Sequence, residues 1–346
     1  MSKAPFDPAT QAAVVVFIGL AFLVGRTLPW SAPGEEPAAA ARATAVEAKA
    51  PPQTPAAPQQ AKTSQSPPAA PIAQPAAFTP QPETSIPDDD FGKAIRFGES
   101  IFQDTKTNAP GYVGNDLRCA NCHLDRGRLP NSAPLWAAYV LYPAYRSKNE
   151  HVNTFAERLQ GCFRFSMNGK APPLGDPVLV ALESYAYFLA RGAPTGVKLA
   201  GQGYPALKKP ESFDFGRGAE VYAQKCAICH GPEGQGQKSA SATVFPPLWG
   251  PASYNWGAGM AVISNAAAFI KSNMPLGQGG SLSDQEAWDV AAFLDGHERP
   301  QDPRFAQTVE ATRAKFHDTP MSAYGTTVNG VLLGASSPPS GPAPSR

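Results

Sequence analysis

The sequence predicts an all-α protein with two similar folded halves. A five-residue motif occurs twice, as Cys119-Ala120-Asn121-Cys122-His123 and as Cys226-Ala227-Ile228-Cys229-His230. Each motif lies between two stretches that carry helix signals. Residues 31–87 are rich in Pro, Ala and Gln and almost free of large apolar side chains, so they cannot build a core. We therefore expect folded structure to begin near Asp88.

The N-terminal segment contains an uninterrupted apolar run of 14 residues, 12–25. This length suits a signal-peptide core, but no A-x-A-like cleavage site follows it. Extending the helix to Trp30 gives about 28 Å at 1.5 Å per residue, close to the thickness of a bilayer core. We expect residues 1–30 to be an uncleaved membrane anchor, with a cleaved signal sequence as the alternative. Residues 31–87 should be a disordered Pro/Ala-rich tether.

The repeated motif is typical of covalent haem attachment. In Cys-x-x-Cys-His, the two thiols form thioethers with the haem and the adjacent His ligates its iron. A zinc site is the alternative, because Cys-x-x-Cys also begins zinc knuckles. However, only one other Cys and three other His remain in the chain to complete two zinc sites. We predict two haem c groups, attached and ligated by two sets of residues: Cys119, Cys122 and His123, and Cys226, Cys229 and His230.

Helix signals flank both motifs. Three acidic residues, 88–90, precede apolar positions and indicate a helix start. Residues 176–190 form a strong helix pattern, with Pro177 in its first turn and Gly192 just beyond its end. In the second half, residues 215–222 lead into the motif, and residues 283–294 predict the closing helix. Each half is therefore predicted to consist, in order, of a helix, the motif, a long irregular segment and a closing helix.

This order resembles the class I cytochrome c fold, whose first and last helices cross beside a haem that lies among loops. The fold class implied is two class I cytochrome c domains in tandem, at residues 88–195 and 196–317. Residues 318–346 are rich in Gly, Ser and Pro, and we expect them to be a disordered tail. A covalent haem implies export, and we expect the folded part to lie in the periplasm, held at the inner membrane.

The sixth iron ligands decide the chemistry of each haem. In the second half, Met274 lies 44 residues after the motif His, in a loop before the closing helix, as the distal ligand of class I cytochromes does. In the first half, Met167 has the same spacing from its motif His. Cys162 is the alternative, because a thiolate beside iron is stabilised by the positive charge of the metal. A buried, inert Cys is also common.

Four segments closely resemble the dihaem thiosulfate dehydrogenases, which form one family with tetrathionate reductases: residues 158–169, 245–250, 257–260 and 273–275. The resemblance runs from about residue 91 to residue 303. It implies that Cys162 is the distal ligand of the first haem and that Arg158 and Ser166 are active-site residues. A further basic active-site residue corresponds to Arg146 or Lys148.

The implied reaction joins two thiosulfate dianions into tetrathionate and releases two electrons. Residues 146–170 carry five basic and two acidic residues, a local charge of +3 in a chain of net charge +1. This concentration of charge suits two anionic substrates, and arginine matches the oxygens of a sulfonate. A thiolate at Cys162 would divide the reaction into two steps through a covalent intermediate. The small net charge indicates no general attraction to nucleic acid.

Other functions remain open at this point. The chain could be a non-enzymatic, membrane-tethered dihaem electron carrier with Met167 on its first haem, or a subunit of a sulfur-oxidising multienzyme system. The enzyme hypothesis favours Cys162 as a catalytic residue and a soluble periplasmic electron acceptor, such as a small cytochrome c or a high-potential iron–sulfur protein. The preferred direction of the reaction is left open.

Overall fold

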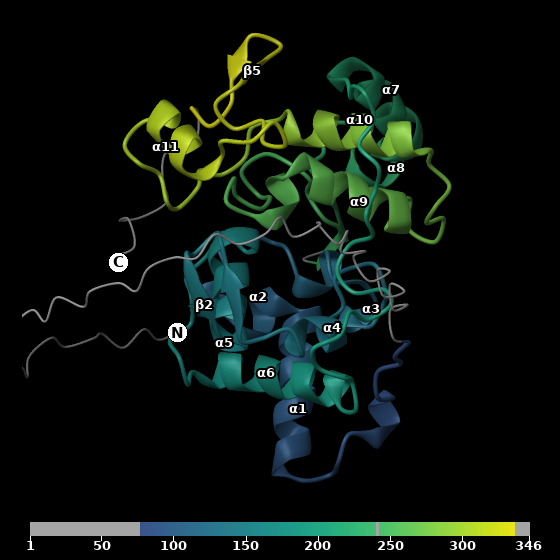
Figure 1. Cartoon of the computed structure of the whole chain (residues 1–346), viewed down its shortest axis with the longest axis vertical. Coiled ribbons are helices and arrows are strands. Elements are labelled where there is room, and N and C mark those ends of the chain that lie inside the picture. Colours follow the sequence, from purple (N-terminus) through teal and green to yellow (C-terminus); the bar gives the residue numbers. More distant parts are fainter. Residues whose placement is uncertain (1–76, 240–241, 336–346) are drawn as a thin grey trace, which may run out of the picture. The chain divides into compact units, whose positions relative to one another are not determined.

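The computed structural model describes residues 77–239 and 242–335, and all of them fall in one compact unit, Ala70–Arg346. The expected anchor and most of the expected tether lie outside the described residues. Among the described helices, none combines the length and apolar character needed to cross a membrane. The described chain is mostly helical, with three small antiparallel hairpins (Figure 1).

The elements follow one another along the chain in two sets. The first set consists of η1 (Glu83–Ser85), α1 (Asp90–Gln103), α2 (Thr105–Asn108), η2 (Pro110–Tyr112), η3 (Cys119–Asn121), α3 (Leu124–Gly127), α4 (Leu135–Tyr139), β1 (Ala144–Arg146), β2 (His151–Asn153), α5 (Phe155–Gly161), the π-helix η4 (Cys162–Ser166) and α6 (Pro177–Ala190). The second set consists of α7 (Phe215–Lys225), α8 (Ala227–His230), β3 (Gln237–Ser239), β4 (Ala242–Phe245), η5 (Gly259–Ala261), α9 (Ile263–Asn273), α10 (Asp284–Asp295), α11 (Val309–Phe316), β5 (Thr327–Val328) and β6 (Val331–Leu332).

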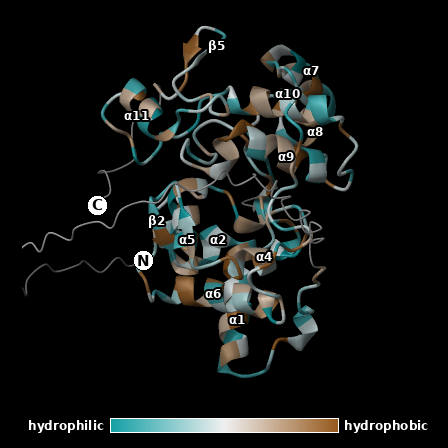
Figure 2. Cartoon of the chain, in the orientation of Figure 1, coloured by the Kyte–Doolittle hydropathy of each residue, from teal (hydrophilic) through white to brown (hydrophobic). Residues whose placement is uncertain are grey.

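The four predicted helices are confirmed, and side-chain caps explain where they begin. The carboxylate of Asp89 accepts a hydrogen bond from the Gly92 amide at the start of α1. Asp176 caps α6 in the same way, directly before Pro177. Ser283 and Glu286 form a capping box at the start of α10. Apolar and polar residues alternate along α1 and α7 (Figure 2), so each helix can turn one face to a core.

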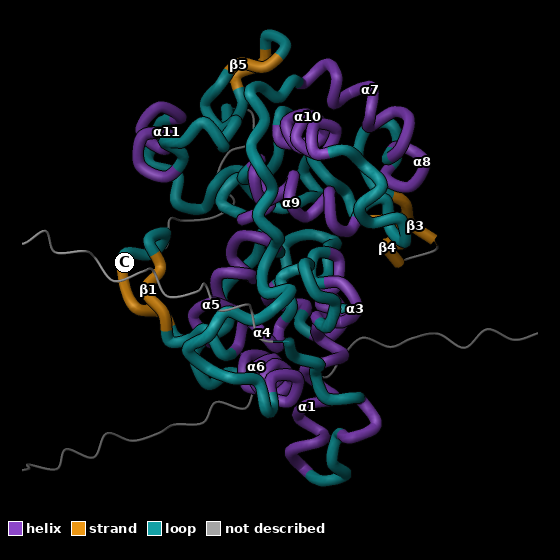
Figure 3. Tube along the Cα trace, turned by 45° about the vertical axis from the view of Figure 1, so that its right-hand side comes forward, coloured by secondary structure: helices purple, strands orange, loops and turns teal. Residues whose placement is uncertain are grey.

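In each half, the first helix packs against the predicted closing helix through a glycine. Helix α1 lies against α6, and α7 lies against α10 (Figure 3). A Cβ atom on Gly98 of α1 would lie 2.0 Å from the Ala181 carbonyl oxygen of α6. A Cβ atom on Gly218 of α7 would lie 2.1 Å from the Asp289 carbonyl oxygen of α10. The two helix pairs therefore approach backbone to backbone, which agrees with a cytochrome c-like fold.

Two hydrophobic clusters form the core, and their membership does not follow the predicted domain boundary. One cluster contains α1, α4 and α6, and the other contains α7, α9 and α10. However, Tyr254, Trp256, Ala258 and Ala261 from the second half belong to the first cluster. The loop before α9 therefore packs with the first half, which a division at residue 196 did not predict.

The end of the expected tether is ordered, contrary to our prediction for residues 77–87. The Phe78 ring lies 5.4 Å from the Trp136 ring, between centroids. Glu83 pairs with Arg126 at 2.6 Å, and Arg128 donates two hydrogen bonds of 2.7 Å to the Gln81 carbonyl. The average composition of residues 31–87 did not predict this order, because one aromatic residue and one acidic residue are enough to attach residues 77–87 to the first half.

The expected tail is also ordered as far as residue 335, so the prediction for residues 318–335 is wrong. The hairpin β5–β6 lies here, and Tyr324 and Leu333 are almost completely buried in the first cluster. The Tyr324 ring stacks on His317, whose Nε2 lies 3.0 Å from the buried Asp302 carboxylate. The burial of a few apolar side chains against distant partners orders this segment despite its Gly- and Ser-rich composition.

Candidate active site and haem-binding cavities

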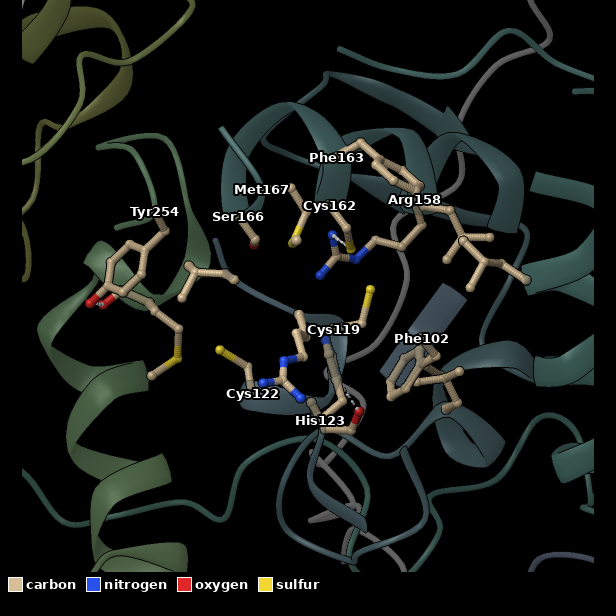
Figure 4. A pocket seen from close by; sticks show the side chains of 18 of the residues that line it. Phe102, Cys119, Cys122, His123, Arg158, Cys162, Phe163, Ser166, Met167 and Tyr254 are labelled. Atoms are coloured by element: carbon tan, nitrogen blue, oxygen red, sulfur yellow. Dashed lines mark hydrogen bonds between the residues drawn. The ribbon is translucent and has the colours of Figure 1, made fainter. Parts of the chain in front are cut away.

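The first motif lines an apolar cavity together with most of the predicted active-site residues. Cys119, Cys122 and His123 lie on one side of it, and α5 and η4 lie on the other (Figure 4). The lining residues from α5 and η4 and the residue that follows them are Phe155, Arg158, Leu159, Cys162, Phe163, Ser166 and Met167. The structure thus brings the two sequence segments together around one space.

His123 has the geometry of an iron ligand. Its Nδ1 lies 2.7 Å from the Ala133 carbonyl oxygen, which fixes the ring and leaves Nε2 free for a metal. Burial lowers the pKa of His123 to about 4, so the imidazole is neutral at neutral pH. A cavity with two adjacent thiols, a neutral imidazole and apolar walls fits a covalently attached haem.

Cys162 is the first residue of a π-helix that continues directly from α5. Helix α5 is fixed at its start by a capping box between Thr154 and Glu157. The guanidinium nitrogen Nη1 of Arg158 donates a hydrogen bond to Cys162 Sγ at 3.3 Å. The four-residue spacing therefore places both side chains on one helical face. Single π turns inside helices are frequent at functional sites.

Arg158 brings a permanent positive charge to this cavity. It lies deep in the protein, yet its side chain is exposed because it borders the open space of the cavity. The neighbouring Cys162 raises the pKa of Arg158 further above its ordinary value, so the guanidinium stays charged. The arrangement can stabilise a thiolate at Cys162 or hold an anion beside it.

Neither of the two upstream basic residues lines the cavity itself. Arg146 ends β1, and its guanidinium lies 5.9 Å from the centre of the Tyr142 ring. Lys148 is an exposed residue, but its ammonium lies 3.6 Å from the centre of the Phe165 ring and donates to the Gly257 carbonyl. Burial of this group, together with nearby Arg304, lowers the pKa of Lys148 to about 7, and solvent at its exposed part offsets some of that effect.

The second motif lines a second cavity, which also contains the predicted distal ligand. Cys226, Cys229 and His230 share this cavity with Met274, which directly follows α9. His230 Nδ1 lies 3.0 Å from the Pro246 carbonyl oxygen, matching the arrangement at His123. The donors again fit a covalently attached haem, and the Met274 thioether is a further group in this cavity that could ligate iron.

The two cavities share a wall that includes residues our sequence analysis did not single out. Leu117, Cys122, Tyr254 and Met260 line both cavities. The Arg299 guanidinium lies 4.4 Å from the centre of the Tyr254 ring and is buried behind it. Met260 belongs to the segment 257–260 that carries the family resemblance, but no local sequence signal marks Tyr254, which lies on an irregular loop.

Comparisons with known proteins agree with this geometry. Residues 214–294 match the family model described as cytochrome C oxidase, cbb3-type, subunit III. The chain is 62% identical to a thiosulfate dehydrogenase of Thiomonas intermedia over 260 residues, which cover 75% of this chain and 83% of the relative. It is 54% identical to a thiosulfate dehydrogenase of Stutzerimonas stutzeri, over 74% of this chain and 85% of the relative.

A solved structure gives the same result. The thiosulfate dehydrogenase (TsdBA) of Marichromatium purpuratum superposes with a TM-score of 0.73 at 51% sequence identity. The match covers 75% of this chain but only 57% of the solved chain, which is therefore considerably longer. Since the high identities extend over most of the folded part and two cavities carry haem attachment motifs, the chain belongs to the thiosulfate dehydrogenase family of c-type cytochromes.

Proposed function

We propose that the chain is a periplasmic dihaem enzyme that oxidises two thiosulfate ions to tetrathionate, or catalyses the reverse reaction. The observation that carries the proposal is the contact between Arg158 and Cys162 in a cavity that also holds a haem attachment motif. Cys162 would be the distal ligand of the first haem and the sulfur nucleophile. When bound, haem c supplies an acceptor for one electron at a time.

Cys162 would act in two steps. In the first, its thiolate forms a sulfur–sulfur bond with the outer sulfur of one thiosulfate, and two electrons leave for the acceptor. In the second, the outer sulfur of another thiosulfate forms the central bond of tetrathionate, while the bond to Cys162 breaks and the thiolate is regenerated. No proton is needed. Arg158 would hold sulfonate oxygens through both steps, with Ser166 beside it and Lys148 or Arg146 attracting the second anion.

The second cavity would hold an electron-transfer haem, attached at Cys226 and Cys229 and ligated by His230 and Met274. A neutral thioether stabilises reduced iron better than an anionic thiolate does, so electrons should run from the first haem to the second. We propose a soluble periplasmic protein, such as a small cytochrome c or a high-potential iron–sulfur protein, as the final acceptor.

Residues 1–30 would anchor the enzyme to the inner membrane. The support for this proposal is the apolar run without a cleavage site, followed by a Pro/Ala-rich segment. Cell fractionation with N-terminal sequencing tests it. A protein found free in the periplasm, with a new N-terminus after residue 25, would identify the run as a signal peptide instead.

Replacing the nucleophile tests the enzymatic function. Cys162→Ala should keep both haems, because attachment uses four other cysteines, but thiosulfate oxidation should fall by several orders of magnitude. Arg158→Ala should reduce activity while a thiolate spectrum remains. Lys198→Ala, which removes an exposed charge elsewhere, is the control and should behave as wild type. Near-normal thiosulfate oxidation by Cys162→Ala would remove the nucleophile role from Cys162. Wild-type protein that neither oxidises thiosulfate nor reduces tetrathionate would instead favour the non-enzymatic electron carrier.

A further inference from the structure

Two sulfur atoms, not one, face the first cavity from the side opposite His123. Met167 lines this cavity with Cys162 and exposes only 3% of its surface. Figure 4 shows the sulfur atoms of both residues side by side, across the cavity from His123. The proposed chemistry uses the Cys162 sulfur and gives Met167 no role.

The π-helix is the reason why both residues reach the same space. In an α-helix, residues five apart point about 140° away from each other, because one turn takes 3.6 residues. Here the Met167 amide donates to the Cys162 carbonyl at 3.0 Å, which closes a wider turn of five residues. The wider turn brings Met167 back to the face that carries Cys162.

The Met167 backbone is fixed, whereas its side chain is adaptable. The Met167 carbonyl accepts a hydrogen bond from the Gly114 amide at 2.9 Å, and the Gly169 amide donates to the Phe163 carbonyl at 2.9 Å. Methionine has three rotatable bonds and a polarisable thioether that tolerates different packing. A small change of side-chain torsion can therefore move its sulfur within the cavity without moving the helix.

We propose that Met167 is a reserve ligand of the first haem, which takes the distal position whenever Cys162 leaves it to bond with thiosulfate. The inference rests on the proposed function of Cys162. When Cys162 forms its sulfur–sulfur bond, its electron pair is committed to that bond and the distal position is vacated. Met167 donates a thioether lone pair there and withdraws it when the thiolate is regenerated, so the exchange needs no oxidant, reductant or proton.

The exchange would assist the step in which electrons leave the substrate. A thioether raises the reduction potential of a haem relative to a thiolate. Met167 would therefore favour electron withdrawal from sulfur while Cys162 is occupied, and it would exclude water from the vacated position. Cys162 would restore the lower potential when tetrathionate is released.

The first test removes Cys162 from the holoprotein and measures the far-red charge-transfer band of methionine-ligated ferric haem. Wild type should show the band of one such haem, at Met274. In Cys162→Ala the intensity of this band should be twice that of wild type, because Met167 now ligates the first haem as well. Adding Met167→Leu to Cys162→Ala should return the band to the wild-type intensity. Cys162→Ala with Met260→Leu is the matched control and should keep the twofold band. An unchanged band in Cys162→Ala, or loss of its gain only with Met260→Leu, would overturn the proposal.

The second test occupies Cys162 in the otherwise intact enzyme. Oxidised protein is treated with tetrathionate, and mass spectrometry measures the adduct on Cys162. The band should grow towards twofold in proportion to the adduct in wild type but stay constant in Met167→Leu, although both form the adduct. An adduct without band growth would overturn the role of Met167 alone. The absence of both adduct and thiosulfate oxidation would overturn the proposed function instead.

Discussion

At the scale of single residues, the candidate site combines the Cys162 sulfur with cations from different segments. Arg158 reaches Cys162 along one helix, whereas Lys148 arrives from the β1–β2 hairpin and lies on the Phe165 ring. Arg304, from the C-terminal segment, lies 5.1 Å from the centre of the same ring. Arg304 is paired with the buried Asp302 carboxylate at 2.6 Å, so a cation from far away in the sequence lies beside this ring with its charge balanced.

Lys148 should make substrate binding depend on pH. Its pKa is lowered to about 7 by burial, so it loses its positive charge as the pH rises through that value. The KM for thiosulfate should therefore rise between about pH 6 and about pH 8 in wild type. Lys148→Arg should flatten this rise, because a guanidinium stays charged. Steady-state kinetics across this range measure the profile. A rise of KM with pH that Lys148→Arg leaves unchanged would show that Lys148 is not the titrating group.

Met274 should be the distal ligand of the second haem. Met274→Gly should remove the far-red charge-transfer band of the oxidised wild-type protein, because it removes the thioether that lines the second cavity. Absorption spectra of the oxidised holoprotein measure this change. A band that persists in the variant would transfer the role to Met260, which also lines the second cavity, or would place Met167 on the first haem.

At the scale of elements, the two glycine contacts set how the helices cross. Helices α1 and α6 meet at Gly98, and helices α7 and α10 meet at Gly218. Each crossing lies four residues before an aromatic residue of the same helix, Phe102 or Tyr222, that is buried in the adjoining core. Both halves therefore share the same arrangement, a helix crossing at a glycine followed four residues later by a buried aromatic residue.

Alanine at either crossing should destabilise the protein. Helix propensity alone would make Gly218→Ala stabilising by up to about 1 kcal/mol. However, its Cβ would lie 2.1 Å from the Asp289 carbonyl oxygen, and overpacking of this kind costs roughly 1–3 kcal/mol. Gly98→Ala should behave in the same way. Urea unfolding measures both, with Gly216→Ala as the control, since its nearest atom is the Asp214 carboxylate at 3.2 Å. Equal stability of Gly218→Ala and Gly216→Ala would contradict this account of the crossing.

At the scale of the whole molecule, the two halves interlock through polar contacts as well as through the shared core. The buried Asn255 amide donates to the Arg164 carbonyl at 2.9 Å and to Asn168 at 3.1 Å. Asn115 in turn donates to the Ser253 carbonyl at 3.1 Å. These bonds tie the loop that carries Tyr254 to the segment that carries Cys162, so the wall between the cavities is built from both halves.

The molecule should carry two haems on each chain. Denatured protein should retain both after acid–acetone extraction, because each is attached through two thioethers. Replacing Cys226 and Cys229 together by Ser is the control and should leave one haem. Wild-type protein with a single haem and a free Cys pair, measured by mass spectrometry, would contradict the dihaem assignment.

Short-range patterns in the sequence were sufficient for the haem motifs, the four main helices with their caps, and the contact between Arg158 and Cys162. Each depends on residues within a few positions of one another, where backbone geometry alone fixes which side chains share a face. The tertiary structure decided the rest: the shared wall of Tyr254 and Met260, the cation of Arg304, and the ordered segments at residues 77–87 and 318–335. These features depend on burial against residues more than 30 positions away, whose stabilisation cannot be read from local composition. The π turn that brings Met167 beside Cys162 depends on both local sequence and tertiary structure. The local pattern favours an α-helix there, and the wider turn is accompanied by a hydrogen bond from the Gly114 amide to the Met167 carbonyl.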